Sequence, residues 1–400
     1  MYRFISLIMT LLASTSLLAN PVIPLATQPQ TPAFSPSAPN LDAQGYILID
    51  AITGKVLAEK NADSRKAPAS LTKLMSVYLI SSAIKNGSLH WDDKVRISSK
   101  AWKTEGSRMF VKVDNEVPVK NLFAGVIVAS GNDATVALAE HLAGTEEAFT
   151  NLMNQQASAL GMQNSHFTDS TGLPNPELYT TPRDLAVLAQ AYIKNFPEDY
   201  KIFSEKWISY NNIRQPNRNR LLWRYPSADG LKTGHTSDAG YCLVASAMKN
   251  GTRLISVVMG ASNDQSRTED SIRLLTYGFR FFETHKLYNG NTSVMRTHVW
   301  QGKKSDVALG FSDDFSVTIP VGQSKRLQTR VELTSLKAPI IKGQAYGSVN
   351  VLLNNQVVAS KPLVALEDNP KGSLWRRAAD AMGYSLRKVF SKSQETMNTG

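Results

Sequence analysis

Two pairs of short apolar runs, one near each end of the first 285 residues, have the spacing of β-hairpins. Residues 46–49 are followed by the turn residues Thr53 and Gly54 and then by a second run over 55–58. Residues 241–248 and 253–259 flank Asn250-Gly251, a dipeptide that favours a tight hairpin turn. The two patterns predict a sheet built from strands that lie far apart in the sequence.

Between these hairpins, apolar residues recur with the period of an α-helix. We expect residues 70–160 to be mainly helical, with one helix over 132–143. Another helix should begin at Pro182 behind the capping Thr181, where Arg183 and Asp184 have structural roles, and a long helix over 265–283 should follow. Strands at both ends with helices between them predict an α/β domain over residues 41–285.

The pattern changes after residue 285. Short alternating runs, broken by Gly, Pro, Asn and Asp, predict a small all-β domain over 286–370 that serves as a spacer or interaction platform. In the last segment, 371–400, the apolar residues of 372–393 fall on one helical face and Lys and Arg lie elsewhere around it. This pattern indicates an amphipathic helix in an anionic membrane surface, although a terminal helix docked on the protein has the same pattern.

The first 40 residues have the composition of a leader. Residues 1–19 carry Arg3 and then a short apolar run, which is typical of a secretory signal peptide; an uncleaved anchor is the alternative. Residues 20–40 are rich in Pro, Ser, Thr and Gln and predict an extended lead into the first domain.

Composition narrows the classes of partner and cofactor. The hydrophobic share of 42% and charged share of 19% are those of a globular protein, and the formal net charge of +11 favours an acidic partner. No zinc-ligand spacing or basic-aromatic pattern supports nucleic acid as that partner. The single cysteine, Cys242, lies in an apolar run and should be buried, and the scattered histidines predict neither a metal nor another cofactor.

Ser70 and Lys73 have the spacing of a nucleophile and its base. They lie three residues apart behind Pro68, on one face of the predicted helix. A lysine amine of lowered pKa can take the proton of a serine hydroxyl, and the helix N-terminus offers backbone N–H groups to an oxyanion. The pattern is short, however, and by itself it is more often a solvated surface.

Two later motifs change this interpretation. Ser130-Gly131-Asn132 follows the apolar run over 122–129, and Lys232-Thr233-Gly234 opens a segment that continues into the apolar run after Tyr241. In this order the three motifs resemble those of penicillin-binding proteins and class A β-lactamases, and the Ser-Gly-Asn form resembles D-alanyl-D-alanine carboxypeptidases. Residues 218–223, 230–236 and 278–284 are also similar to the low-molecular-mass penicillin-binding proteins of Gram-negative bacteria.

The resemblance implies a fold and a location. The fold is a serine β-lactamase or transpeptidase-like domain, with an antiparallel sheet and helices, followed by the small all-β domain and the C-terminal amphipathic helix. The activity is removal of the terminal D-alanine from peptidoglycan pentapeptides ending in D-Ala-D-Ala, with β-lactams as covalent inhibitors. The protein would lie on the periplasmic side of the inner membrane, held by its terminal helix.

The resemblance also implies roles for single residues. Ser70 attacks the substrate carbonyl, Lys73 acts as base, and Ser130 passes a proton to the leaving amine. The positive charge of Lys232 helps to hold Lys73 neutral. Among the substrate-binding residues, Asn132 would bind the peptide amide, and Lys232 and Thr233 the terminal carboxylate. Gly234 would let the substrate backbone approach the strand closely, and the backbone N–H groups of Ser70 and His235 would bind the oxyanion. Arg218 and Arg267 would contribute to substrate binding and site order. For the two arginines a surface or structural ion pair is the competing interpretation.

Three rival functions share part of this pattern. A class A β-lactamase would carry a Glu-x-x-Leu-Asn loop, and the nearest acidic stretch, at Glu177, lacks the Leu-Asn. A DD-endopeptidase would use the same three motifs on peptide cross-links. A non-catalytic wall-binding or morphology protein would be expected to have lost a motif residue, whereas all three motifs are intact here.

Overall fold

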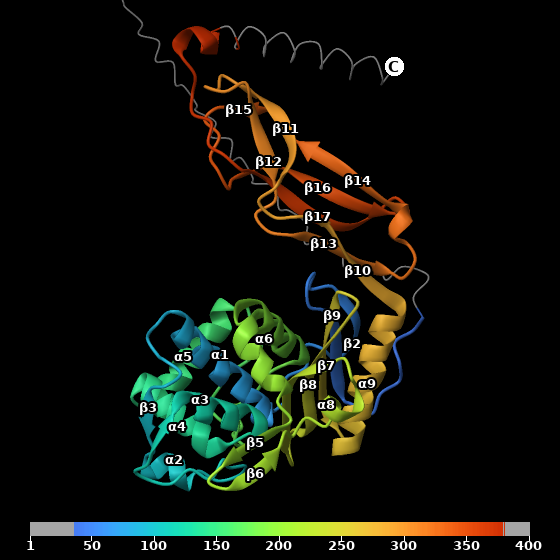
Figure 1. Cartoon of the computed structure of the whole chain (residues 1–400). Helices are drawn as coiled ribbons and strands as arrows, with labels where there is room; N and C mark the ends of the chain where they lie inside the picture. The colour runs from blue at the N-terminus through green and yellow to red at the C-terminus, as the bar shows by residue number, and fades with distance from the viewer. Residues whose placement is uncertain (1–35, 379, 381–400) are drawn as a thin grey trace, which may run out of the picture. The chain divides into compact units, whose positions relative to one another are not determined.

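The computed structural model describes residues 36–378 and 380 of the 400. Its first domain is built on a five-stranded antiparallel sheet in the order β2-β1-β9-β8-β7 (Figure 1). The strands are β1 (Gly45–Asp50), β2 (Val56–Lys60), β7 (Ala228–Thr236), β8 (Gly240–Lys249) and β9 (Thr252–Ala261). Both predicted hairpins are therefore present, and β1 joins them by pairing with β9.

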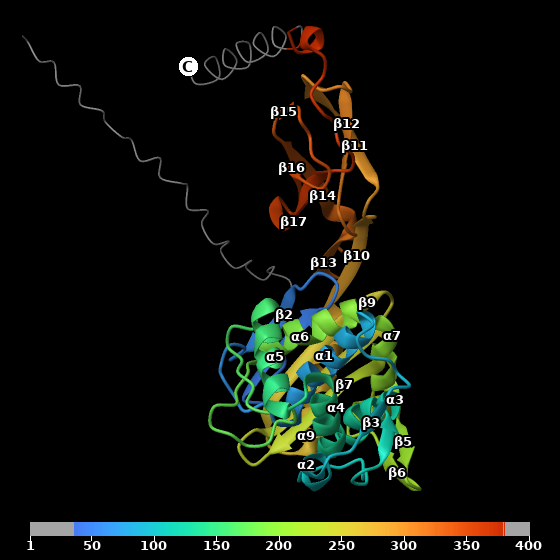
Figure 2. The same cartoon turned by 90° about the vertical axis from the view of Figure 1, so that its left-hand side faces the viewer.

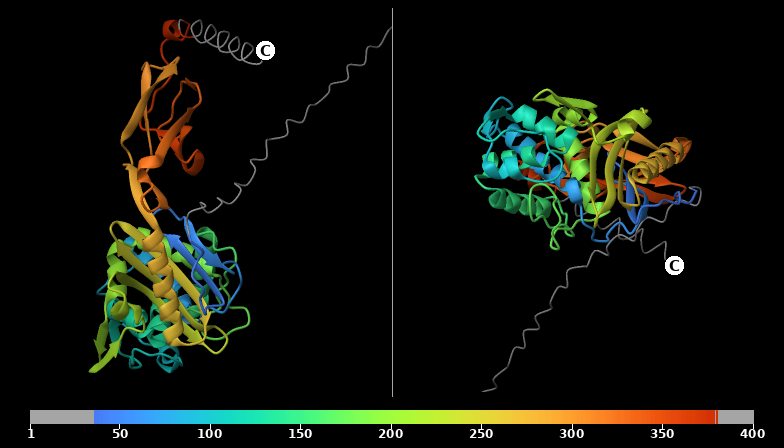
Figure 3. Two further views of the ribbon diagram at one scale, coloured as in Figure 1. Left: turned by 90° about the vertical axis from the view of Figure 1, so that its right-hand side faces the viewer. Right: turned by 90° about the horizontal axis from the view of Figure 1, so that it is seen from below.

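The central strands are apolar on both faces because the sheet is covered on both. In β1, Ile47 belongs to the large core shared with the helical region, while its neighbour Leu48 belongs to the core under α9 (Asp264–Phe281). The alternation of side chains along a strand sends successive residues to opposite faces. Figure 3 shows α9 lying across one face of the sheet. This burial on both sides explains why these strands appear in the sequence as continuous apolar runs.

The other face of the sheet packs against the helical region. Its helices are α1 (Lys73–Lys85), α2 (Ser99–Lys103), α3 (Val119–Ala124), α4 (Asn132–Ala143), α5 (Glu146–Ala159), α6 (Pro182–Asn195) and α7 (Pro197–Tyr200). The short helix α8 (Leu221–Arg224) places Leu221 in the core under α9. Two short hairpins interrupt the helices, β3 (Lys94–Arg96) with β4 (Glu116–Pro118) and β5 (Trp207–Tyr210) with β6 (Ile213–Pro216). The sequence pattern did not predict either hairpin, since strands of three or four residues have too few positions to show a period.

The start of α6 is as the sequence predicts. The Thr181 hydroxyl accepts from the Asp184 N–H at 3.1 Å, and Pro182 is the first helical residue. Arg183 forms ion pairs with Glu59 and Asp63, and the Asp184 carboxylate accepts from the Asn164 N–H. The structural roles expected of Arg183 and Asp184 are confirmed.

The second domain is β-rich, as predicted (Figure 2). Strands β10 (Phe282–Tyr288) and β13 (Phe315–Pro320) form one pair. A six-stranded sheet has the order β14-β16-β17-β12-β11-β15 and consists of β11 (Ser293–Trp300), β12 (Asp306–Gly310), β14 (Leu327–Leu333), β15 (Leu336–Lys337), β16 (Ala345–Leu353) and β17 (Gln356–Ala365). A core of its own, which includes Val299, Phe311 and Leu363, stabilises this domain.

Several expectations need correction or lie outside the described residues. The closing helix α9 ends at Phe281, two residues before the predicted end, because β10 begins at Phe282. The predicted signal peptide, most of the lead and all but the first turn of the helix over 372–393 lie outside the described residues. Within residues 36–378, no helix combines the length and hydrophobicity that crossing a membrane requires.

Candidate active site

Ser70 and Lys73 meet at the junction of two kinds of helix. Ser70 lies in the 3-10 turn Ala69–Thr72, and Lys73 is the first residue of α1. The Lys73 Nζ lies 2.9 Å from the Ser70 Oγ and 2.7 Å from the carbonyl oxygen of Thr171. A neutral amine has two N–H donors and one lone pair. It can therefore donate to the Thr171 carbonyl and still direct its lone pair at the Ser70 hydroxyl.

Burial lowers the pKa of the Lys73 amine. The side chain is fully buried, and desolvation lowers the pKa of Lys73 to about 7, while the carboxylates of Asp169 and Asp133 act in the opposite direction. The sequence analysis expected repulsion from Lys232 to help; burial is the larger cause. The loss of solvent around Lys73 is what disfavours its charged form.

The loop that supplies the Thr171 carbonyl was missed by sequence reasoning. One carboxylate oxygen of Asp169 accepts from the N–H groups of Thr171 and Gly172 and from the Thr171 hydroxyl, at 2.6–2.7 Å. This is an Asx turn, for which the sequence Asp-Ser-Thr-Gly is a recognisable signal. The turn fixes the carbonyl that holds Lys73, so the loop positions the base.

Ser130 is held in an unusual backbone conformation. It ends the π-helical turn Gly125–Ala129 with φ 59° and ψ 33°, a left-handed conformation that non-glycine residues rarely adopt. Such conformations and π-turns cluster at functional sites. The Lys232 Nζ donates to the Ser130 Oγ at 2.8 Å and to the Thr233 carbonyl at 3.0 Å. The three motifs thus supply two serine–lysine pairs, Ser70 with Lys73 and Ser130 with Lys232.

Asn132 and Asp133 begin α4 and have different surroundings. The Asn132 Nδ2 donates to the Glu105 carbonyl at 2.5 Å, whereas its Oδ1 is buried and has no hydrogen-bond partner within the described residues. A buried acceptor without a partner is costly, so this oxygen suits a donor that a ligand would bring. The Asp133 carboxylate accepts from the N–H groups of Met109, Phe110 and Val111 and orders the segment that faces α4.

Lys232, Thr233, Gly234 and His235 lie on β7, the edge strand of the sheet. The motif therefore lies within a strand of its own and precedes a turn; it does not open the apolar strand β8, as the sequence analysis expected. An edge strand leaves a row of backbone N–H and C=O groups unpaired, to which an extended peptide can add as a further strand.

Gly234 is required by a neighbouring backbone segment of the protein itself. A Cβ at this position would lie 2.9 Å from the Pro68 carbonyl oxygen and 3.2 Å from the Leu71 nitrogen. The glycine thus lets β7 approach the turn that carries Ser70, and the close approach of the substrate backbone stays a prediction. A side chain here would separate the nucleophile from the strand.

Burial and neighbouring cations act together on Lys232. Desolvation, followed by the positive charges of Lys73, Arg267 and Arg218, lowers the pKa of Lys232 well below its usual range. A carboxylate brought into contact with this amine would favour its charged form. The cations around Lys232 therefore favour an anionic ligand, such as the carboxylate terminus of a peptide.

The two arginines occupy different environments. Arg267 is 7% exposed, forms an ion pair with Asp264 and donates to the Gly234 carbonyl at 3.0 Å, so it secures β7. Arg218 lies exposed between β6 and α8, and its positive charge contributes to the lowered pKa of Lys232. The exposed His235 ring stacks on Tyr241 with centroids 4.0 Å apart.

The remaining chemistry-bearing residues lie apart from this arrangement. Cys242 is fully buried, as predicted. Within the described residues, no group of three His, Cys, Asp or Glu side chains is placed to hold a metal ion. Glu177 is exposed.

Known proteins share both domains. A family model described as D-alanyl-D-alanine carboxypeptidase matches residues 32–263, and one described as penicillin-binding protein 5, C-terminal domain, matches residues 282–371. D-alanyl-D-alanine carboxypeptidase DacC of Escherichia coli is 45% identical over 362 residues, which cover 88% of this chain and 90% of the relative. DacA of Haemophilus influenzae is 41% identical over 365 residues, covering 90% and 93%.

Solved structures agree with these relatives. Penicillin binding protein 5 from Haemophilus influenzae has a TM-score of 0.81 at 42% identity and covers 84% of this chain and 100% of its own. Penicillin binding protein 6B from Escherichia coli has a TM-score of 0.70 at 36% identity, with coverage of 84% and 98%. The transpeptidase-like α/β domain and the β-rich domain predicted from the sequence are thereby confirmed. The chain belongs to the D-alanyl-D-alanine carboxypeptidase family of serine peptidases.

Proposed function

We propose that this carboxypeptidase releases the terminal D-alanine through an acyl-enzyme on Ser70, with Lys73 as the base. The observation that supports this assignment is the buried amine of Lys73, with a pKa lowered to about 7 and its Nζ 2.9 Å from the Ser70 Oγ. At neutral pH a large fraction of this amine is unprotonated, and it can take the serine proton as the hydroxyl attacks. A lysine with an ordinary pKa would be charged and could not do so.

Acylation would proceed along β7. The substrate adds to this edge strand, and its terminal carboxylate lies against Lys232 and Thr233. The Ser70 oxygen bonds to the carbonyl carbon of the penultimate D-alanine, and the backbone N–H groups of Ser70 and His235 bind the oxyanion. When the C–N bond breaks, Ser130 passes the proton that Lys73 took from Ser70 to the leaving amine of D-alanine. The Asn132 Oδ1 accepts from an amide N–H of the substrate, a partner that it lacks among the described residues.

Deacylation returns the enzyme when water attacks the acyl carbonyl and the Ser70 oxygen leaves. β-Lactams acylate Ser70 in the same way, and related structures hold such inhibitors; penicillin-binding protein D2 of Listeria monocytogenes is described in an ampicillin-bound form. Glu177, which stood nearest to a β-lactamase glutamate in sequence, is exposed and its carbonyl accepts from His166. We therefore expect slow release of β-lactams, as in a penicillin target. Peptide cross-links are an alternative substrate of the same site.

The first prediction concerns the reaction itself. The purified full chain in detergent should release free D-alanine from a peptide ending in L-Lys-D-Ala-D-Ala, and Ser70→Ala should release none, because the hydroxyl is the nucleophile. A coupled D-alanine assay measures both. Stable penicillin labelling at Ser70 without D-alanine release would contradict the proposed substrate and favour a binding role. Equal release by Ser70→Ala would contradict the assignment of the nucleophile.

We further propose that the terminal segment, 371–400, holds the protein on the periplasmic face of the inner membrane, with residues 286–370 as spacer and residues 1–19 as the export signal. At the start of the predicted helix, Leu374 and Trp375 are 77% and 86% exposed, and Arg376 and Arg377 follow them. Exposed apolar residues beside basic ones suit an interface with anionic lipid. Anionic lipid also suits the net charge of +11.

The second prediction tests this anchor. Removal of residues 371–400 should move the protein from the membrane fraction to the soluble fraction, with D-alanine release unchanged. Replacing both Leu374 and Trp375 by Asp in the full chain should have the same direction of effect, since a carboxylate disfavours insertion among lipids. Fractionation followed by immunoblotting measures the distribution. A truncated chain that stays with the membrane would show that another segment is the anchor.

A further inference from the structure

Ser170, which precedes Thr171 in the loop that holds the base, is bonded through all of its polar groups. Its N–H and its hydroxyl both donate to the Glu146 Oε1, at 3.1 and 2.6 Å, and its carbonyl accepts from the Ser76 hydroxyl at 2.6 Å. Ser170 is fully buried, and Ser76 is 2% exposed. Glu146 is the first residue of α5, and Ser76 lies on α1. Two helices therefore hold one residue of this loop.

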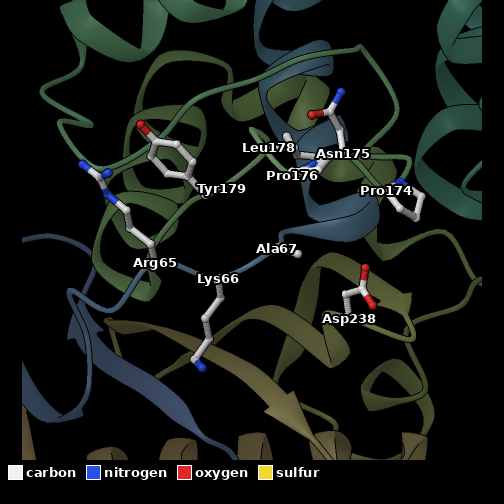
Figure 4. A pocket seen from close by; sticks show the side chains of 9 residues that line it. All are labelled: Arg65, Lys66, Ala67, Pro174, Asn175, Pro176, Leu178, Tyr179 and Asp238. Atoms are coloured by element: carbon white, nitrogen blue, oxygen red, sulfur yellow. The ribbon is translucent and has the colours of Figure 1, made fainter.

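The Asx turn sets the shape of the loop but not its place in the domain. Its three hydrogen bonds to the Asp169 carboxylate all stay within residues 169–172. The residues that follow, 174–179 except 177, line a cavity of about 590 Å³ (Figure 4). Because the loop borders open space there, packing on that side does not fix it. The place of the turn relative to α1 therefore depends on contacts such as those of Ser170.

The contacts of α1 with the loop are in register. Lys73 and Ser76 lie three residues apart, on one face of the helix, and they donate to the consecutive carbonyls of Thr171 and Ser170. A movement of the loop that breaks one of these contacts therefore disturbs the other. Glu146 acts on the same residue from α5, and its removal would leave the N–H and the hydroxyl of Ser170 buried without an acceptor.

The other carboxylate oxygen of Glu146 faces the surface. Its Oε2 lies 3.0 Å from the Lys100 Nζ, which also pairs with Glu147 at 2.8 Å. The Lys100 and Glu147 side chains are 46% and 75% exposed, whereas the Glu146 side chain is 12% exposed. Exposed ion pairs contribute little to stability, so the Oε1 that accepts from Ser170 is the part of Glu146 that bears on the loop.

We propose that Glu146 is a positioning residue of the carboxypeptidase reaction: it holds Ser170 so that the Thr171 carbonyl stays on the Lys73 amine and the loop keeps water from that amine. Glu146 acts through the loop and not on the reacting atoms. The inference rests on the proposed function, because it takes Lys73 to be the base.

The proposal predicts a change in the titration of the base. Burial is the largest cause of the lowered Lys73 pKa, so a displaced loop that admits water should raise this pKa. Less unprotonated amine is then present at pH 7. The charged groups that act on this amine are Asp169 and Asp133, which raise its pKa, and Lys232, which is coupled to it by repulsion. All three are retained in the variants below.

The pH profile of penicillin acylation tests this role in the full chain. In Glu146→Leu, which removes the acceptor, we expect acylation at pH 7 to be about tenfold or more slower and the midpoint of the acid limb to lie about one pH unit higher. Loss of a negative charge alone would lower the Lys73 pKa, so a higher midpoint reports exposure of the amine.

Two glutamine variants are the matched controls. Glu146→Gln keeps an acceptor oxygen for Ser170 and should restore the rate to within about threefold of the wild type and the midpoint with it. Glu147→Gln changes the neighbouring partner of Lys100, does not touch the loop in its hydrogen bonds, and should equal the wild type. Ser170→Ala removes one of the two donors to Glu146 and should raise the midpoint by a smaller amount.

A midpoint that is unmoved or lower in folded Glu146→Leu would overturn the proposal, even if Tm falls, because a merely structural role leaves the titration of Lys73 unchanged. If Glu146→Leu does not fold, Ser170→Ala decides in the same way. Equal losses in Glu146→Leu and either glutamine variant would also overturn it. Wild-type acylation without an acid limb near pH 7 would instead overturn the proposed function, and the inference with it.

Discussion

Lys73→Met should reduce the rate of Ser70 acylation by penicillin by about 10²–10⁴, the usual contribution of a general base. Methionine fills a similar volume in this fully buried position, but it has no lone pair basic enough to take the serine proton. The unfolding free energy should change by less than about 2 kcal/mol, because the variant removes a buried amine and leaves only the Thr171 carbonyl without its donor. Intact-mass spectrometry measures the acylation rate, and thermal unfolding measures stability.

The matched control is Lys85→Met in the last turn of the same helix. The Lys85 side chain is exposed and donates to the Asn195 carbonyl, far along α1 from the serine. Its loss should leave acylation unchanged. If Lys73→Met acylates within about threefold of the wild type, another group takes the serine proton and the role proposed for Lys73 is wrong.

Gly172→Ala should disrupt the site through the loop that holds Lys73. The glycine has φ +86°, and a Cβ there would lie 1.9 Å from the Ala69 carbonyl oxygen, a backbone atom next to Ser70. Either the loop or the nucleophile turn must move, and with it the Thr171 carbonyl that holds Lys73. We expect a loss of about 3 kcal/mol or more of stability, seen as a fall of about 6–12 °C in Tm. The rate of acylation should also fall by about tenfold or more, because the displaced loop no longer positions Lys73 beside Ser70.

Gly87→Ala is the control that distinguishes the steric clash of an added Cβ from the cost of a positive φ. Gly87 has φ +81°, but a Cβ there has nothing within 4 Å. It should therefore lose only about 1 kcal/mol, or about 2–4 °C, and retain full acylation. Equal effects of the two substitutions would show that the contact between Gly172 and the Ser70 turn does not constrain the site.

The sequence predicted the structure best where a functional motif or a turn signal lies beside a regular pattern of apolar residues. Ser70 with Lys73, and the hairpin at Asn250-Gly251, are local signals, and the structure has them close to where they were expected. The pairing of Lys232 with Ser130 joins residues 102 apart, so only the resemblance to a family, and no local pattern, could place them together.

Other features depend on tertiary packing that one sequence does not show. The cause of the lowered Lys73 pKa is burial, and burial depends on the Asp169–Gly172 loop folding over α1. Gly234 matters because of the Pro68 carbonyl, an atom from a distant segment. The short strands β3 to β6 have too few residues for a period, so the contacts of their neighbours decide their structure.

The pH dependence of penicillin acylation tests the central claim, a neutral Lys73 beside Ser70, most directly. The pKa of about 7 predicts that the second-order rate falls about tenfold per pH unit below pH 7, because only the unprotonated amine is a base. Lys232→Arg, whose guanidinium does not titrate, should keep that acid limb and so assign it to Lys73. A rate that stays constant down to pH 5.5, or that rises only near the ordinary lysine pKa of 10.5, would contradict the account.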